Sequence, residues 1–178
     1  MIRLLKAGLF RLKKDILFWI FIFLTIGLAI LTLVRYVPIE GITLDSALNE
    51  FLIYIGLFIA IFVSIFVGKE HSQGIIRNKI IVGHSRFSIF LANLIICIIV
   101  SLLCELIYLA IIFLVGTPLL GQLQMTLSQF IGILVNTIFI IISFCSIYNF
   151  VTMLCSEITI STTICIILFI AMFIALKI

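Results

Sequence analysis

The chain has 178 residues, of which 65% are hydrophobic and only 10% are charged, and its formal net charge is +4. Soluble domains of this length carry about a quarter charged residues and cannot bury so much Ile, Leu and Phe, which excludes an ordinary soluble protein. At this hydropathy a small positive charge points to orientation in a membrane and gives no reason to expect a nucleic-acid partner.

The apolar residues form five long runs, at residues 16–34, 51–68, 89–115, 130–154 and 158–175. Backbone groups in lipid must pair internally, so only helices or closed barrels can span a membrane. The runs are too long for barrel strands and do not alternate, which favours helices. We therefore predict one all-α domain over residues 1–178, a polytopic transmembrane helical bundle. The first run exceeds a signal-peptide core and no cleavage pattern follows it, so we expect a retained span.

Residues 1–14 precede the first span and have an apolar and a basic side. The apolar positions are Ile2, Leu5, Leu9 and Leu12, and the basic positions are Arg3, Lys6, Lys13 and Lys14. This pattern predicts an amphipathic helix in the headgroup layer, with a basic face that favours anionic lipid. The alternative is a disordered basic tail that only sets the topology.

The loop at residues 69–88, between the second and third runs, holds four of the eleven Lys and Arg and both histidines. Its centre reads GIIRNKIIVG, and the flanking Gly74 and Gly83 predict a short helix with one apolar and one basic side. Ser85 is expected to cap the third span. Nine Lys and Arg lie in this loop or before the first span, whereas only Arg35 lies in the loops opposite, so this side is predicted to be cytoplasmic. The loop would either offer its basic residues to a partner or merely set the orientation.

The stretch GKEHSQGIIRNKIIVGHSRFSIFLANLI resembles the first cytoplasmic loop of ABC type-2 export permeases, including the bacteriocin and antimicrobial-peptide immunity group. The matching positions are Glu70, Gly74, Ile75, Ile76, Arg77, Asn78, Gly83, His84, Ser85 and Arg86. The predicted N-terminal helix is also similar to the elbow helix of that family. The resemblance implies a bacterial cell membrane, a second permease subunit of the same or a related chain, and a separate ATP-binding-cassette ATPase that carries ATP and Mg. It implies six spans, whereas this sequence predicts five.

In that family the short loop helix couples the ATPase to the spans. By this resemblance the residues expected to anchor the coupling helix are Ile75, Ile76, Ile80 and Ile81, those expected to face the ATPase are Arg77, Asn78 and Lys79, and those expected to hold the loop ends are Glu70 and Arg86. The sequence contains no G-x-x-x-x-G-K-[ST], so we expect no catalytic residue and no cofactor on this chain itself.

Polar residues inside the spans are candidates for a substrate path. Glu105 is an ionisable group at membrane depth. In the fourth run, a broad polar face is predicted from Asn136, Ser143, Ser146, Asn149 and Thr152. Glu105, Asn136 and Asn149 would line a path, or all these groups would make structural contacts between helices.

No metal site or active site is expected. His71 and His84 are thirteen residues apart without a nearby Cys, and the five cysteines form no CxxC pair, which favours buried apolar roles. The leading interpretation is the membrane subunit of an ATP-driven exporter for amphipathic peptides, antibiotics or lipid-like compounds. The alternatives are an ATP-independent secondary transporter or channel, a non-transporting scaffold and, least favoured, an integral-membrane enzyme.

Overall fold

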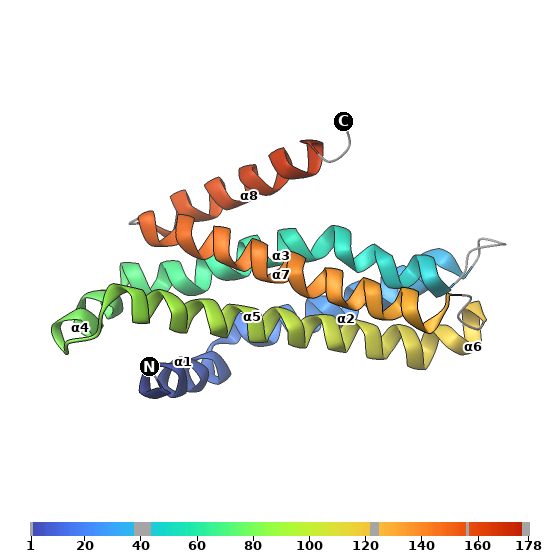
Figure 1. Ribbon diagram of the computed structural model, residues 1–178, viewed down its shortest axis with the longest axis horizontal. Helices are drawn as coiled ribbons and strands as arrows, with labels where there is room; N and C mark the ends of the chain where they lie inside the picture. Colours follow the sequence, from blue (N-terminus) through green and yellow to red (C-terminus); the bar gives the residue numbers. More distant parts are fainter. Residues whose placement is uncertain (1, 38–43, 122–124, 156, 176–178) are drawn as a thin grey trace.

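The computed structural model describes residues 2–37, 44–121, 125–155 and 157–175, and these ranges contain helices and no strand. The elements are α1 (Ile2–Lys14), α2 (Ile16–Tyr36), α3 (Leu44–Ser72), α4 (Ile75–Ile81), α5 (Arg86–Ile111), a π-helical turn η1 (Ile112–Gly116), α6 (Thr117–Leu120), α7 (Leu127–Leu154) and α8 (Ile158–Ala175). The predicted all-α bundle is confirmed (Figure 1).

Four segments of the described chain are long and apolar enough to cross a membrane. They are Ile16–Tyr36, Tyr54–Ser72, Arg86–Leu120 and Leu127–Leu154, of 21, 19, 35 and 28 residues. A hydrocarbon core about 30 Å thick needs about 20 helical residues, so this is a membrane protein with four such spans. The fifth predicted span, α8, is a helix of 18 residues that falls short of this group, and its crossing remains a prediction.

The helices extend beyond the apolar runs because polar residues at their ends also adopt helical structure. α3 begins at Leu44 instead of residue 51, and α7 begins at Leu127 instead of residue 130. At α7 the Thr126 and Gln129 side chains form a capping box that starts the helix three residues before the apolar run. The side chain of Ser85 caps α5 as predicted, accepting a hydrogen bond from Ser88 N at 3.2 Å.

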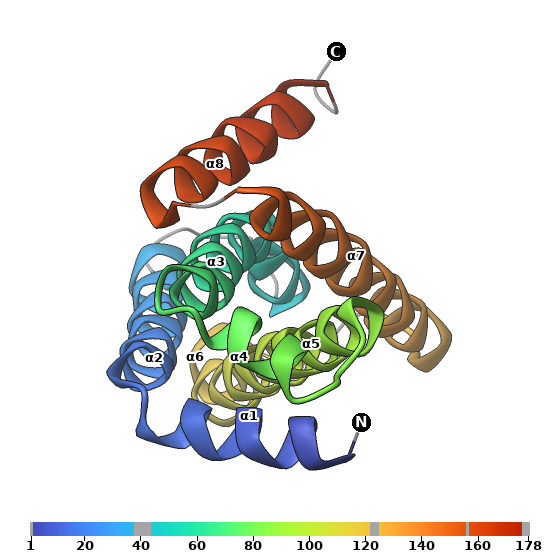
Figure 2. The ribbon, with the colours of Figure 1, turned by 90° about the vertical axis from the view of Figure 1, so that its left-hand side faces the viewer.

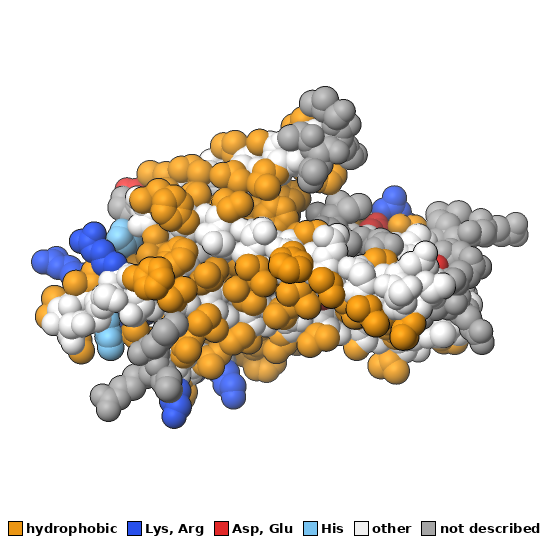
Figure 3. Space-filling model, in the orientation of Figure 1, with side chains coloured by type: hydrophobic (Ala, Val, Ile, Leu, Met, Phe, Trp, Pro, Cys, Tyr) orange, Lys and Arg blue, Asp and Glu red, His pale blue; other side chains and the backbone are white. Residues whose placement is uncertain are grey.

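The bundle is organised around α3, which packs against α2, α5, α7 and α8. Figure 2, a view along the bundle, shows α2, α5 and α7 around α3, with α8 tilted away on the outer side. The contact between α3 and α5 includes the stacked rings of Phe51 and Tyr108, whose centroids lie 4.4 Å apart. Large apolar side chains such as Phe23, Leu31 and Phe139 remain exposed on the outer surface of the spans, as lipid contact requires (Figure 3).

Helix α1 crosses the bundle transversely, beneath α2 and α5 (Figures 1 and 2). Gly8 lies so close to α5 that a Cβ there would overlap the side chain of Ile96. This close approach holds α1 against α5, and the predicted N-terminal helix is confirmed as a helix with its apolar Leu12 buried against the bundle.

The position of α1 along α5 means that the α3–α4–α5 hairpin projects past it. α5 begins at Arg86, ten residues before Ile96, and ten helical residues rise about 15 Å. Figure 1 shows α4 at the end of the molecule, beyond α1. The base of this hairpin stays in contact with α1, because Ile76 of α4 packs against the cluster of Leu4 and Ile89.

Candidate functional site

The hairpin at the α4 end contains a helix of seven residues between two glycines, as the sequence predicts. Gly74 has φ 68° and Gly83 has φ 94°, values in the left-handed region that L-residues with a Cβ rarely adopt. These two glycines therefore reverse the chain into and out of α4, and the backbone requirement explains why Gly stands at both ends.

A buried carboxylate, Glu70 near the end of α3, joins this hairpin to the rest of the bundle. Its Oε1 lies 2.7 Å from Arg11 Nη1 of α1 and 2.7 Å from Lys79 Nζ of α4. Its Oε2 accepts a hydrogen bond of 2.8 Å from Asn93 Nδ2 of α5. Since Glu70 is only 2% exposed, both oxygens depend on these three partners, and four helices meet at one carboxylate. We call Glu70, Arg11, Lys79 and Asn93 the Glu70 junction.

Further contacts fasten α1, and Asp15 directly after it, to α3 beside this junction. Arg11 Nη2 donates to the Phe66 carbonyl at 3.1 Å, and the Arg11 guanidinium stacks over the Phe66 ring at 4.5 Å. Lys69 Nζ lies 3.1 Å from the carboxylate of Asp15, which also caps α2 by accepting from Leu17 N. The corner between α1 and α2 is thus tied to the same end of α3, and these elements can move only together or by breaking charged hydrogen bonds.

The Glu70 junction shows that the role expected for Lys79 is wrong and agrees with the role expected for Glu70. Lys79 was expected to face a partner, but it points inward to Glu70 and its side chain is only 18% exposed. Arg77 and Asn78 are exposed, and their expected contact with the ATPase stays a prediction. Glu70 holds its end of the loop as expected, whereas Arg86, expected to hold the other, is exposed on the rim of a groove. The prediction for Lys79 was wrong because the sequence pattern of a basic helix does not show which of its basic residues lies next to a buried carboxylate.

The expected apolar anchor of α4 is only half correct. Ile76 packs against the buried Leu4, Ile89 and Ala92, so this side of α4 does rest on α1 and α5. Ile80 and Ile81, however, are 38% and 74% exposed. Residues 76 and 81 are five apart and therefore lie about 140° apart around a helix, so one surface cannot bury both.

The end of the hairpin carries an exposed apolar cluster flanked by arginines, which we call the hairpin tip. Ile81, Val82 and Phe87 are 74%, 75% and 69% exposed. The exposed Arg77 and Arg86 flank them. Figure 3 shows Lys, Arg and His side chains gathered at this end of the molecule.

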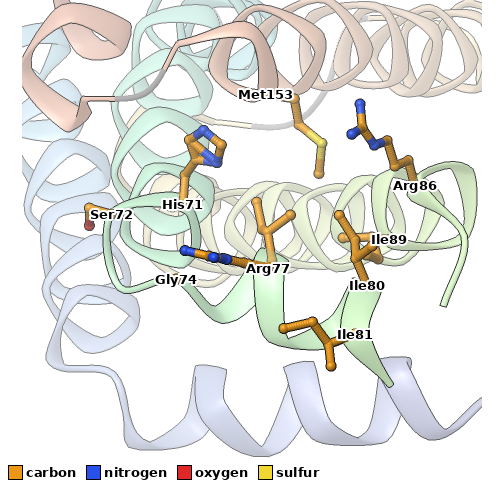
Figure 4. A pocket seen from close by; sticks show the side chains of 10 residues that line it. His71, Ser72, Gly74, Arg77, Ile80, Ile81, Arg86, Ile89 and Met153 are labelled. Carbon is orange, nitrogen blue, oxygen red and sulfur yellow. The ribbon is translucent and has the colours of Figure 1, made fainter. Parts of the chain in front are cut away.

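A groove of about 650 Å³ runs beside the tip, between the end of α3, α4, the start of α5 and the end of α7. Figure 4 shows His71, Met153 and Arg86 along one rim, with Arg77, Ile80 and Ile89 facing them. His71 and His84 both lie in this hairpin. No group of three His, Cys, Asp or Glu side chains that could hold a metal ion occurs in the described part of the chain.

The residues expected to line a substrate path do not come together. Glu105 is 7% exposed within the bundle, and its Oε2 has no partner among the described residues. Asn149 is also buried and donates to the Phe90 carbonyl at 3.1 Å, about 22 Å along α5 from Glu105. Asn136 is exposed and lines a separate hollow of about 610 Å³ at the far end of the bundle.

The single polar face predicted for α7 is wrong. Asn136 and Ser143 are exposed, whereas Asn149 and Thr152 are buried. Thirteen residues separate the two asparagines, which places them about 140° apart around α7 and about 20 Å apart along it. Thr152 donates to the Tyr148 carbonyl of its own helix at 2.7 Å, and its Oγ1 lies 3.9 Å from Cys165 Sγ of α8. Both buried members, Asn149 and Thr152, therefore contact a neighbouring helix, as the structural alternative expects.

Three important residues were missed by the sequence analysis: Arg11, Asp15 and Asn93. Asp15 directly precedes the first apolar run, a position typical of a helix cap. Asn93 is a lone polar residue at the start of the third run, which is a signal for an internal hydrogen bond. Nothing in the local pattern distinguishes Arg11 from the other basic residues of α1.

Comparison with protein-family models, with curated proteins and with solved structures gives no match for this chain. The site must therefore be interpreted from its own residues.

Proposed function

We propose that this chain is the membrane-spanning subunit of an ATP-driven ABC exporter, and that a separate ATPase docks on the hairpin tip. The observation that carries the proposal is the hairpin tip, since Ile81, Val82 and Phe87 stand exposed at the end of the bundle where Lys, Arg and His side chains gather (Figure 3). The exposed Arg77 and Arg86 beside this cluster favour a position in water. An exposed apolar patch rimmed by polar residues is typical of a protein–protein contact.

The charges of the tip favour a partner with an acidic surface. Arg77 and Arg86 are exposed, and neither has an ion pair among the described residues. Arginines beside apolar anchors are the side chains that contribute most at protein interfaces. The groove beside the tip would receive a side chain or loop of the ATPase.

The Glu70 junction supports transmission of movement from the tip. Lys79 fixes α4 to α3, while Arg11 and Asn93 attach α1 and α5 to the same carboxylate. A displacement of α4 would therefore shift α3 and α5 as one body and draw the elbow helix with them. The ATPase would bind ATP and Mg, and the helices of this chain would transmit the movement.

The remaining elements of the proposal rest on charge and on the resemblance of the hairpin sequence. Most of the Lys and Arg lie at the α1–α4 end, which favours a cytoplasmic position for this end and for the N-terminus. The resemblance adds a bacterial cell membrane, a second permease subunit and an amphipathic peptide, antibiotic or lipid-like substrate. The alternatives remain a secondary transporter or channel that needs no ATPase, and a membrane scaffold that transports nothing.

The test is co-purification from native membranes in a mild detergent. The wild-type chain is expected to retain a subunit that hydrolyses ATP, and the double variant Arg77→Glu/Arg86→Glu is expected to lose it. Glu157→Lys changes an exposed charge at the same end of the bundle and serves as the matched control. Retention of the ATPase by the double variant, or transport by the purified chain alone, would contradict the proposal.

A further inference from the structure

A second groove, of about 680 Å³, lies where α1 meets α2 and α5 on the outer surface of the bundle. One wall is formed by α1 and the other by the first turn of α2 and the middle of α5. Its lining is apolar except at two positions, with Leu9, Phe18, Ile99 and Leu103 among the apolar residues. The groove starts at the level of α1 and extends along α5 past Ile96, toward the middle of the span.

The two polar positions are Lys6 and Lys13, which lie on one side of α1. Seven residues separate them, so they are about 20° apart around the helix and about 10 Å apart along it. Both side chains are exposed, and neither has an ion pair among the described residues. Their flexible four-carbon stems allow both ammonium groups to reach one anion between them.

Trp19 marks the depth of this groove. Its ring lines the groove, and its Nε1 donates to the Lys13 carbonyl at 3.3 Å, which closes the corner between α1 and α2. Tryptophan side chains favour the level of the lipid headgroups, where the ring is apolar and the N–H still finds an acceptor. The lysines thus lie at headgroup depth and the apolar floor lies beneath them.

We propose that this groove binds one anionic phospholipid, with its phosphate between Lys6 and Lys13 and one acyl chain along α5 beside Ile99 and Leu103. A zwitterionic lipid would fit the apolar floor but would bring no net charge to the two ammonium groups. A free phosphate would bind the two lysines but would leave the apolar floor of the groove unfilled. The lipid also braces α1, which carries Arg11 to the Glu70 junction. This inference does not depend on the proposed ATPase partner.

The experiment measures lipid binding by the full-length chain in mild detergent, with native mass spectrometry and thermal unfolding as readouts. Phosphatidylglycerol is compared with phosphatidylcholine of the same acyl chains, and inorganic phosphate is a third probe. Two lysines near an anionic headgroup correspond to roughly 30-fold tighter binding of phosphatidylglycerol. The double variant Lys6→Gln/Lys13→Gln is expected to abolish this preference.

Two further variants keep the test decisive. Lys14→Gln removes an adjacent lysine that packs on the Phe10 ring and does not line the groove, and it should keep the preference. Ile99→Trp fills the floor without touching a charge and should weaken both lipids. The proposal is overturned if the wild type shows no preference, if Lys14→Gln loses as much as the double variant, or if phosphate alone stabilises the protein as well as the lipid does. Unchanged lipid binding in Ile99→Trp would overturn it as well, even if the double lysine variant does not fold.

Discussion

Replacing Glu70 with Gln should destabilise the protein more than any other isosteric change at the α4 end. The substitution keeps the shape of the side chain but removes a charge that accepts hydrogen bonds from Arg11, Lys79 and Asn93 at 2.7, 2.7 and 2.8 Å. Removing one member of a buried ion pair costs about 3–5 kcal/mol when the remaining charge stays buried.

The expected loss for Glu70→Gln is smaller than that range because its partners are not fully buried. The Arg11 and Lys79 side chains are 28% and 18% exposed, so both can turn toward water after the charge is lost. We therefore expect a loss of about 2–3 kcal/mol. For a chain of this length that corresponds to a fall of about 5–10 °C in the unfolding midpoint.

The assay is thermal unfolding in mild detergent, combined with a double-mutant cycle on Glu70 and Lys79. Lys79→Gln alone should cost less, because Glu70 keeps Arg11 and Asn93. The double variant should be more stable than the sum of the single losses predicts, by about 1–3 kcal/mol. Glu157→Gln, at an exposed position on the same end, should leave the midpoint unchanged. An unshifted midpoint in Glu70→Gln, or strict additivity in the cycle, would refute the idea that this carboxylate holds the four helices together.

Three further predictions concern local features of the hairpin and use the same unfolding measurement, two of them with a matched control substitution. Gly74→Ala should lower stability by about 1–2 kcal/mol because its φ is 68° and no atom lies within 4 Å of the new Cβ, whereas Gly132→Ala, with equal space but within helix α7, should be neutral or stabilising. Ile81→Ser should have no effect on stability at 74% exposure, whereas Ile89→Ser at 1% exposure should cost about 2–4 kcal/mol; equal losses would contradict the assigned burial. Ser85→Ala should cost about 1 kcal/mol through loss of the α5 cap, and an unchanged midpoint would show that this cap contributes nothing.

The comparison of sequence with structure is most instructive at the α4 hairpin. The glycine pair, the short helix and the Ser85 cap were all predictable, because each depends on backbone conformation over a few neighbouring residues. The inward direction of Lys79 was not predictable, since it depends on where α3 ends relative to α4. The same holds for Arg11, whose partner Glu70 is 59 positions away.

Composition and periodicity alone determined that the chain is helical and lies in a membrane, because the bilayer demands long apolar runs and internal pairing of every backbone group. They also located most of the helices to within a few residues, since hydropathy changes abruptly at the ends of the spans, whereas α3 begins well before its apolar run. Only the tertiary structure decided which charges are buried together, that the hairpin stands beyond α1, and that Glu105, Asn136 and Asn149 lie apart. Those properties depend on the relative depth and rotation of packed helices, and no local pattern of residues records the depth or rotation of a neighbouring helix.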